Sequence, residues 1–344
     1  MNYKKKSKEY LLIGLTATAF LSSASAQSEI GTTTDKKNKT VVGSNHSLAA
    51  SSQQLPVKVT RNQVNLISNI VFSQAAIAGY PNYSLKMDLL QPKSDKPLPL
   101  VVYITGGGFI ASNKDSYLQQ RFDIAEAGYV VASIEYRVAP TAAFPSALID
   151  VKSAIRYLKG NAAKFGIDKS KIAVFGDSAG GYLAALAGAT NDDKMFDKGA
   201  YLDENSVVHA VVDLYGLSDL TKVGEGYPSD IQDRYAESGS TQALWVNGST
   251  TFGPGGGIDK YPAKAQAANP IFYIKKDAPP YLIMHGEKDQ LVSPFQTERL
   301  HLALLEKGVK STRYVVPNAA HGGDYWQQPE VIKVIVDFLN VNLK

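Results

Sequence analysis

Residues 171–180 read Lys-Ile-Ala-Val-Phe-Gly-Asp-Ser-Ala-Gly, and this stretch decides how the rest of the chain is interpreted. Its first half, residues 171–175, is an apolar run that predicts a buried strand. Its second half fits the pattern G-x-S-x-G around Ser178, and the small residues at 179–189 predict a helix. A strand, a sharp turn at a serine and a helix together form a nucleophile elbow. A glycine-rich strand–helix turn without a chemical role is the alternative interpretation.

Strands and helices alternate on both sides of this elbow. The pattern predicts an α/β fold with a mostly parallel, eight-stranded sheet and helices on both of its faces, opened by an antiparallel pair of strands. Strands are expected at residues 65–73, 84–90, 100–105, 129–134, 171–175, 207–214, 281–285 and 312–316. Helices are expected at residues 115–127, 144–164, 179–189, 294–307 and 330–340.

A serine nucleophile needs a base, and His321 is the predicted base. It lies in a loop just past the strand at 312–316, and the active sites of α/β proteins form beyond the carboxyl ends of parallel strands. The other four histidines lie in less suitable places, namely an N-terminal spacer, a strand interior, a strand end and a helix interior (His46, His209, His285 and His301).

The acid that orients the base is expected between the serine and the histidine in the chain. Asp289, four residues past the strand at 281–285, is the predicted acid. Glu287, Asp213 and Asp219 remain alternatives. Asp177 is excluded because it adjoins the serine, so that its side chain should point away from the base.

Backbone N–H groups are expected to stabilise the oxyanion. Ala179, the residue after the nucleophile, supplies one. The loop after the strand at 100–105 reads Thr105-Gly106-Gly107-Gly108-Phe109, and Gly107 and Gly108 are predicted to supply the others. A phosphate-binding role for these glycines is excluded, because no Walker or dinucleotide-binding pattern surrounds them.

Residues 216–269 interrupt the alternation of strands and helices. This stretch is rich in glycine and in aromatic side chains, which predicts a lid-like insertion or a partly ordered excursion. Four aromatic residues are predicted to contact the substrate: Phe109, Trp245, Phe252 and Tyr325. The alternative is that the aromatic residues of the insertion form only its core.

The amino-acid composition excludes several kinds of catalytic and metal site. The chain of 344 residues has no cysteine, which excludes a thiol nucleophile, a cysteine-based zinc site and an iron–sulfur cluster. No metal or organic cofactor is implied.

The net charge is +4, but the first 26 residues hold four lysines and one acid, so the remainder carries only +1. We therefore expect no nucleic-acid partner, and no apolar run reaches the roughly 18 residues of a membrane span. The oligomeric state is not indicated.

Five motifs together resemble a known family. They are residues 103–109 (YITGGGF), 135–140 (EYRVAP), 176–181 (GDSAGG), 285–289 (H-G-x-x-D) and 320–322 (AHG). In this order, across about residues 65–344, the chain resembles α/β-hydrolase serine esterases of the bacterial feruloyl, acetyl-xylan and related carbohydrate esterase branch, near the hormone-sensitive-lipase group. In that family the glycine loop usually begins with histidine, whereas this chain has Thr105, whose side chain we expect to support the loop.

The resemblance and the residues lead to one functional expectation. The chain is expected to hydrolyse carboxylic esters through an acyl-enzyme and without a cofactor. The resemblance implies phenolic-acid (feruloyl or hydroxycinnamoyl) or acetyl esters of plant-derived compounds, as small-molecule or carbohydrate-linked substrates. The alternatives are an amidase or peptidase of the same fold, and a non-catalytic binding protein.

The N-terminus is expected to be a secretory signal peptide at residues 1–26. Four lysines precede a 12-residue apolar run at residues 10–21, and Ala24-Ser25-Ala26 fits a cleavage site. A core helix and an uncleaved anchor are the alternatives. Residues 27–55, rich in Ser, Thr, Lys, Asn and Gln, predict a disordered spacer, and residues 56–344 the catalytic domain.

The signal peptide predicts secretion and a defined mature N-terminus. Intact-mass spectrometry of the protein recovered from the medium of the native host should find a chain that begins at or near Gln27, because an A-x-A site directs cleavage to its carboxyl side. A cytoplasmic chain that begins at Met1 would contradict the prediction.

Overall fold

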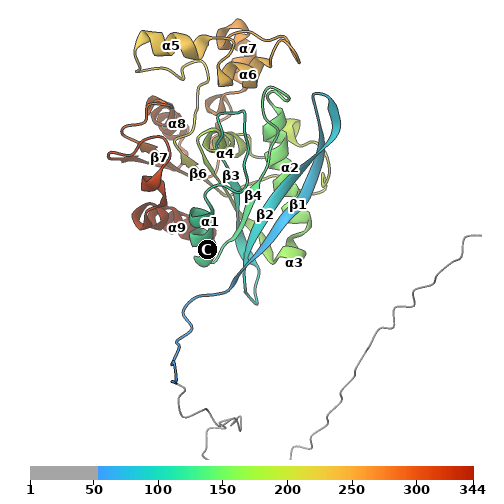
Figure 1. Cartoon of the computed structure of the whole chain (residues 1–344), viewed down its shortest axis with the longest axis vertical. Helices are drawn as coiled ribbons and strands as arrows, with labels where there is room; N and C mark the ends of the chain where they lie inside the picture. The colour runs from blue at the N-terminus through green and yellow to red at the C-terminus, as the bar shows by residue number, and fades with distance from the viewer. Residues whose placement is uncertain (1–52) are drawn as a thin grey trace, which may run out of the picture. The chain divides into compact units, whose positions relative to one another are not determined.

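The apolar runs form one eight-stranded sheet in the computed structural model, which describes residues 53–344 (Figure 1). The predicted signal peptide and nearly all of the predicted spacer lie outside these residues. The strands are β1 (Val64–Ile77), β2 (Tyr80–Pro92), β3 (Leu98–Ile104), β4 (Val130–Ile134), β5 (Ile167–Asp177), β6 (Ala210–Leu214), β7 (Tyr281–Gly286) and β8 (Ser311–Val316). Their order in the sheet is β1-β2-β4-β3-β5-β6-β7-β8.

The directions of the strands match the prediction of a mostly parallel sheet. The pairs β1–β2 and β2–β4 are antiparallel, and every pair from β4 to β8 is parallel. The two opening strands are longer than predicted because they continue to a tight turn, where Gly79 has a φ of 83°. Strand β6 is shorter than predicted, so that His209 precedes it and accepts a hydrogen bond from the N–H of Ile172 (3.1 Å).

Each central strand is buried on both faces because alternate side chains point to opposite sides. In β3, Leu100, Val102 and Ile104 join one apolar cluster, whereas Val101 and Tyr103 join the other. The first cluster packs under α2 (Ser146–Gly160), α3 (Ala162–Phe165), α4 (Ala179–Ala189) and α8 (Phe295–Glu306). The second packs under α1 (Leu118–Glu126) and α9 (Pro329–Leu343). The predicted helices on both faces are therefore confirmed.

The insertion folds into short helices. Figure 1 shows α5 (Ser229–Ala236), α6 (Thr241–Asn247) and α7 (Pro262–Ala267) gathered together, beyond the end of the sheet. The short helix η2 (Ile258–Lys260) joins them, and Ala243, Val246 and Ile258 belong to the same apolar cluster as α4. The insertion is therefore packed onto the domain by its apolar side chains.

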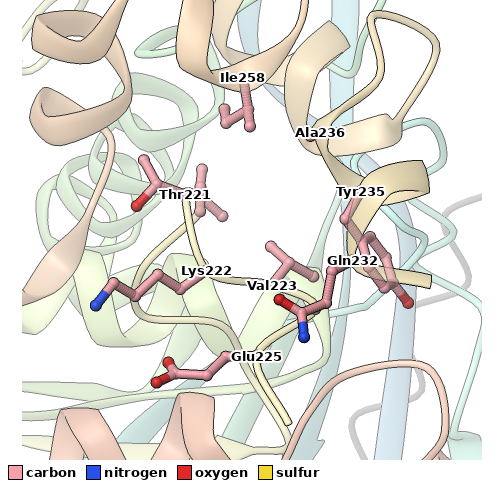
Figure 2. A pocket seen from close by; sticks show the side chains of 10 residues that line it. Thr221, Lys222, Val223, Glu225, Gln232, Tyr235, Ala236 and Ile258 are labelled. Carbon is pink, nitrogen blue, oxygen red and sulfur yellow. The ribbon is translucent and has the colours of Figure 1, made fainter. Parts of the chain in front are cut away.

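A cavity of about 260 Å³ lies within the insertion (Figure 2). The side chains of Thr221, Tyr235 and Ile258 surround it, and every residue that lines it lies between 220 and 258. None of the predicted catalytic residues reaches this cavity. It is partly open to solvent and is separate from the predicted site.

The elbow depends on close backbone contacts at two glycines. A Cβ added to Gly176 would lie 2.1 Å from the carbonyl oxygen of Gly180. A Cβ added to Gly180 would lie 1.9 Å from the carbonyl oxygen of Ile104, at the end of β3. Both distances are far below van der Waals contact, so only glycine lets α4 approach β3 and β5 this closely.

Substitution of Gly180 by alanine should destabilise the domain. We expect Gly180→Ala to lower the free energy of unfolding by about 1–3 kcal/mol or more, because the added methyl group must displace backbone. Urea denaturation measures the change. Gly239→Ala is the matched control, since no heavy atom lies within 4 Å of the Cβ it would add. Equal unfolding midpoints for the two variants would contradict the packing argument.

Candidate active site

Ser178 stands at the sharp turn between β5 and α4. Its φ of 52° and ψ of −121° lie outside the common regions for a residue with a side chain, as a nucleophile elbow requires. The N–H of Ser178 donates to the carbonyl oxygen of Leu214 at the end of β6 (2.8 Å). The strained backbone is thus held from both the neighbouring strand and the helix that begins at Ala179.

The structure brings the three predicted catalytic side chains together. Nε2 of His321 lies 2.8 Å from Oγ of Ser178, and Nδ1 of His321 lies 2.7 Å from Oδ2 of Asp289. They come from the segments that follow β5, β8 and β7, whose carboxyl ends share one edge of the parallel sheet. A hydroxyl, an imidazole and a carboxylate in this order form a nucleophile, a base and the group that orients the base.

Asp289 is fully buried, yet it is surrounded by hydrogen-bond donors. Its Oδ1 accepts the N–H groups of Leu291 and Val292, both at 2.9 Å. Its Oδ2 accepts from His321 and also lies 3.1 Å from Nε2 of His285. Burial by itself would raise the pKa of the carboxyl, but the hydrogen bonds from His285, His321 and the backbone hold this pKa well below its usual range. Asp289 is therefore a carboxylate at neutral pH.

The rival acids have other roles. The carboxylate of Glu287 accepts the N–H of Asn318 (3.0 Å) and so joins the two loops of the site. Asp219 binds Thr221 and Asn269 at the base of the insertion. Asp213 is buried beneath the elbow, and its Oδ1 accepts the N–H of Gly216 (2.9 Å). None of the three is hydrogen-bonded to His321.

Asp177 has no hydrogen bond to His321 among the described residues and supports the glycine loop. Its Oδ1 accepts the N–H of Gly106 (3.0 Å) and lies 3.4 Å from the hydroxyl of Tyr103. Tyr103 in turn donates to Gln120, whose amide donates to the carbonyl oxygen of Trp326. Burial raises the pKa of Asp177 to about 6, although the N–H of Gly106 favours the charged form. This buried network joins the glycine loop to the loop that carries the histidine.

The predicted oxyanion loop adjoins the nucleophile. A Cβ on Gly106 would lie 3.0 Å from Cβ of Ser178. Gly107 and Gly108 have φ values of 147° and 58°, and a Cβ on Gly107 would lie 2.2 Å from the carbonyl oxygen of Ala111. Within residues 53–344 the N–H groups of Gly107 and Gly108 have no protein acceptor. Their role as oxyanion donors stays a prediction, which the absence of a protein acceptor allows.

Within residues 53–344, the side chain of Thr105 makes none of the hydrogen bonds expected to support the glycine loop. The residue is buried, and its hydroxyl has no hydrogen-bond partner among the described residues. The loop is held instead through the backbone of Thr105, whose carbonyl oxygen accepts the hydroxyl of Tyr136 (2.8 Å). The buried Tyr136, from the EYRVAP motif, thus supports the loop.

Aromatic rings hold the loop of His321. The ring of Tyr215 meets the imidazole edge-to-face at 4.7 Å between centroids, and it meets Trp326 in the same way at 4.6 Å. The indole N–H of Trp326 donates to the carbonyl oxygen of Ala320, beside the base (3.1 Å). These contacts restrict the imidazole to the orientation that serves both Ser178 and Asp289.

The four predicted substrate contacts divide into two groups. Phe109 and Trp245 stack on each other at 4.9 Å, and the indole N–H of Trp245 donates to the hydroxyl of Tyr182. Both are buried and pack in the core, so they present almost no surface to a ligand, and their contact with the substrate stays a prediction. Phe252 and Tyr325 are 54% and 47% exposed and remain open to a ligand. Phe252 lies in a groove of about 460 Å³ between the insertion and residues 140–144, without a catalytic residue in its lining.

Metal binding and membrane insertion find no support in the described part of the chain. Within residues 53–344 no three histidine, aspartate or glutamate side chains gather where they could hold a metal ion. No helix in this part has both the length and the apolar character needed to cross a bilayer.

Two groups of functional residues escaped the sequence reasoning. The support of the glycine loop by Asp177, Tyr103 and Gln120 joins segments far apart in the chain, and no local pattern signals it. The sequence did hint at a role for His285, because this residue ends the predicted buried strand at 281–285, four residues before Asp289. Its contact with that carboxylate is a tertiary feature all the same.

The fold and the site together define an α/β-hydrolase with a serine–histidine–aspartate triad. The chain belongs to the BD-FAE family, whose family model matches residues 87–304.

Comparisons with individual proteins agree with this family. Esterase LipC of Mycobacterium tuberculosis is 32% identical over 234 residues, which cover 67% of this chain and 54% of that protein. Esterase LipQ of the same organism is 30% identical, over 71% of this chain and 55% of that protein. The chain thus spans about half the length of these curated relatives. A solved structure described as a truncated carbohydrate esterase from gut microbiota is 27% identical, with a TM-score of 0.70, over 81% of this chain and 96% of that one.

Loss of the Asp289 charge should remove most of the activity while leaving the fold intact. We expect Asp289→Asn to lower kcat for a nitrophenyl ester by about 10⁴-fold, because the amide holds His321 in the wrong tautomer. Steady-state kinetics and circular dichroism measure the two effects. Glu287→Gln, in the same loop, is the control and should retain most of the rate. A large loss in Glu287→Gln and a small one in Asp289→Asn would show that the acid is misassigned.

Proposed function

We propose that the chain is an exported serine hydrolase that cleaves carboxylic esters through an acyl-enzyme. The observation that carries the proposal is the hydrogen-bonded chain Ser178–His321–Asp289, together with N–H groups beside Ser178 that have no protein acceptor. Relatives and solved structures that bear the names esterase and carbohydrate esterase support it. The N-terminal pattern of basic, apolar and small residues supports export.

The reaction follows from the positions of these groups. Oγ of Ser178 attacks the ester carbonyl carbon while Nε2 of His321 takes its proton, and the carbonyl oxygen becomes an oxyanion. The N–H groups of Gly107, Gly108 and Ala179 stabilise this charge, and each such donor is worth about 3–4 kcal/mol in the transition state. The imidazolium then protonates the leaving alcohol. Water, deprotonated by His321, releases the acid and restores Ser178.

The proposed substrates are phenolic-acid or acetyl esters of plant-derived compounds. The resemblance to feruloyl and acetyl-xylan esterases and the carbohydrate-esterase neighbour support this class. Of the four aromatic residues predicted to contact the substrate, Phe252 and Tyr325 are exposed. They are therefore the proposed contacts for an aromatic acyl or sugar group. We further propose that the insertion at residues 216–269 acts as a lid that sets this preference.

A substrate panel tests the proposal. The secreted form is assayed with nitrophenyl acetate, methyl hydroxycinnamates, acetylated xylan and peptide anilides, beside Ser178→Ala. We expect ester turnover that falls by at least about 10³-fold in Ser178→Ala, because only the oxyanion donors and binding then remain. Phe252→Ala should lower kcat/KM for hydroxycinnamates more than for nitrophenyl acetate.

Three outcomes would contradict the proposal. Faster cleavage of anilides than of esters would indicate an amidase. An absence of turnover with every substrate would indicate a binding protein. Equal losses on both ester types in Phe252→Ala would remove this residue from the proposed acyl site.

A further inference from the structure

His285 is a completely buried histidine behind the triad that the proposed reaction does not use. It is the penultimate residue of β7, and none of its side chain is exposed. Nε2 lies 3.1 Å from Oδ2 of Asp289 and 3.0 Å from the carbonyl oxygen of Val292. Both neighbours of Nε2 are acceptors, so this nitrogen must carry a proton.

The other ring nitrogen of His285, Nδ1, contacts the hydroxyl of Thr297, which also accepts a hydrogen bond from Arg313. Nδ1 of His285 lies 2.9 Å from Oγ1 of Thr297, on α8. Nε of Arg313, on β8, donates to the same oxygen at 3.2 Å, and Nη2 of Arg313 donates to the carbonyl oxygen of Pro294 at 3.1 Å. Because the guanidinium donates to this hydroxyl oxygen, the Thr297 O–H points to an acceptor. Two acceptors are in reach, Nδ1 of His285 at 2.9 Å and the carbonyl oxygen of Pro294 at 3.2 Å, and Nδ1 is the nearer. A neutral His285 with its proton on Nε2 satisfies every one of these contacts.

The donor from His285 completes the surroundings of the catalytic carboxylate. An ionised carboxylate accepts about four hydrogen bonds. Two backbone N–H groups donate to Oδ1 of Asp289. Oδ2 faces Nδ1 of His321 and Nε2 of His285, and it shares the single Nε2 proton with the carbonyl oxygen of Val292. Without His285, Oδ2 would have only the catalytic imidazole as a partner, and the carboxylate would be free to pivot about Oδ1.

We propose that His285 is a positioning residue of the triad, whose Nε2–H, directed by Thr297 and Arg313, holds Oδ2 of Asp289 in line with His321. The inference rests on the proposed hydrolase function. It extends the hydrogen-bonded chain through the sheet from Arg313 on β8 to Ser178. Of the three triad residues, His285 contacts only Asp289, and no hydrogen bond joins it to Ser178 or to the predicted oxyanion donors within residues 53–344.

Two variants of His285 separate positioning from packing. In His285→Gln, the side-chain amide keeps an N–H donor near the place of Nε2. In His285→Asn, the shorter amide cannot reach Asp289. Both changes disturb the core. Only His285→Asn, however, removes the donor, so the difference between the two variants reports on positioning.

The pH profile of kcat/KM is the main measurement, with nitrophenyl acetate as substrate. In His285→Asn we expect kcat to fall at least about tenfold, because misplacement of a reacting group by about 1 Å costs on the order of 10²-fold. We also expect the lower midpoint of the profile to move upward by about half a pH unit or more, because a carboxylate with one donor fewer attracts the His321 imidazolium more strongly. His285→Gln should resemble the parent in both respects.

The other groups around the base are the same in all these variants. Asp177 at the elbow, Tyr215 after β6 and Tyr117 near Gly322 are titratable groups close to His321 or its loop. Glu287 and Lys288 contact Asn318 in the same loop, and Asp324 and Tyr325 follow His321 in the chain. His301→Gln is the histidine control, because His301 lies on α8 and its Nδ1 contacts only Ser311 (2.8 Å). It should leave the rate and the midpoint unchanged.

Several results would overturn the inference. His285→Asn and His285→Gln with equal kcat and equal midpoints would do so, as would a loss of rate that follows the melting temperature with an unmoved midpoint. If neither variant folds, Thr297→Val decides, because it keeps His285 but removes the hydroxyl that directs it. It should move the midpoint in the same direction by a smaller amount, and parent-like kinetics would reject the inference.

The experiment distinguishes this inference from the proposed function. The rate at which a fluorophosphonate labels Ser178 depends on the triad but not on the natural substrate. A parent protein that is labelled but hydrolyses no ester would refute the proposed function alone. Equal labelling rates for the parent and His285→Asn would refute the positioning role alone.

Discussion

The close approach of α4 to the ends of β3 and β5 is the constraint on which the rest of the site depends. It requires Gly176 and Gly180 to lack side chains, and it places Ser178 at the edge of the sheet in a strained conformation. The parallel strand order then brings the segments after β7 and β8 to the same edge. Asp289 and His321 reach the serine from there without any long excursion of the chain. The geometry of the triad is therefore a consequence of sheet topology and one tight helix–strand contact.

Three buried carboxyl groups beneath this edge differ in pKa, and the hydrogen-bond donors that surround them differ as well. Asp289 has four donors, and its pKa is held well below the usual range despite burial. Asp177 accepts one backbone N–H and the weaker contact of Tyr103, and burial raises its pKa to about 6. Asp213 accepts a single N–H, and burial raises its pKa to about 7. The hydrogen-bond donors around Asp289 outweigh the effect of burial, whereas burial outweighs the fewer donors around Asp177 and Asp213.

The insertion contains both buried aromatic residues, such as Trp245, and exposed ones, such as Phe252. Trp245 joins Phe109 and Tyr182 in the core, which fastens α6 to the segment that carries the predicted oxyanion donors. A change in the insertion can therefore reach the glycine loop through packing. Phe252, by contrast, is exposed and lines the groove between the insertion and residues 140–144. Aromatic content alone did not separate these two positions, because a ring is equally suited to core and to ligand contact.

The sequence by itself determined the elbow, the alternation of strands and helices, and the identity of the serine, the histidine and the favoured acid. These features depend on local patterns: small residues where a helix meets a strand, apolar runs, and loops directly after strands. Only the tertiary structure decided that Glu287 joins two loops, that Trp245 is core, and that His285 contacts Asp289. Such assignments depend on which side chains from distant segments share a buried space, and burial then decides which hydrogen bonds each polar group must make.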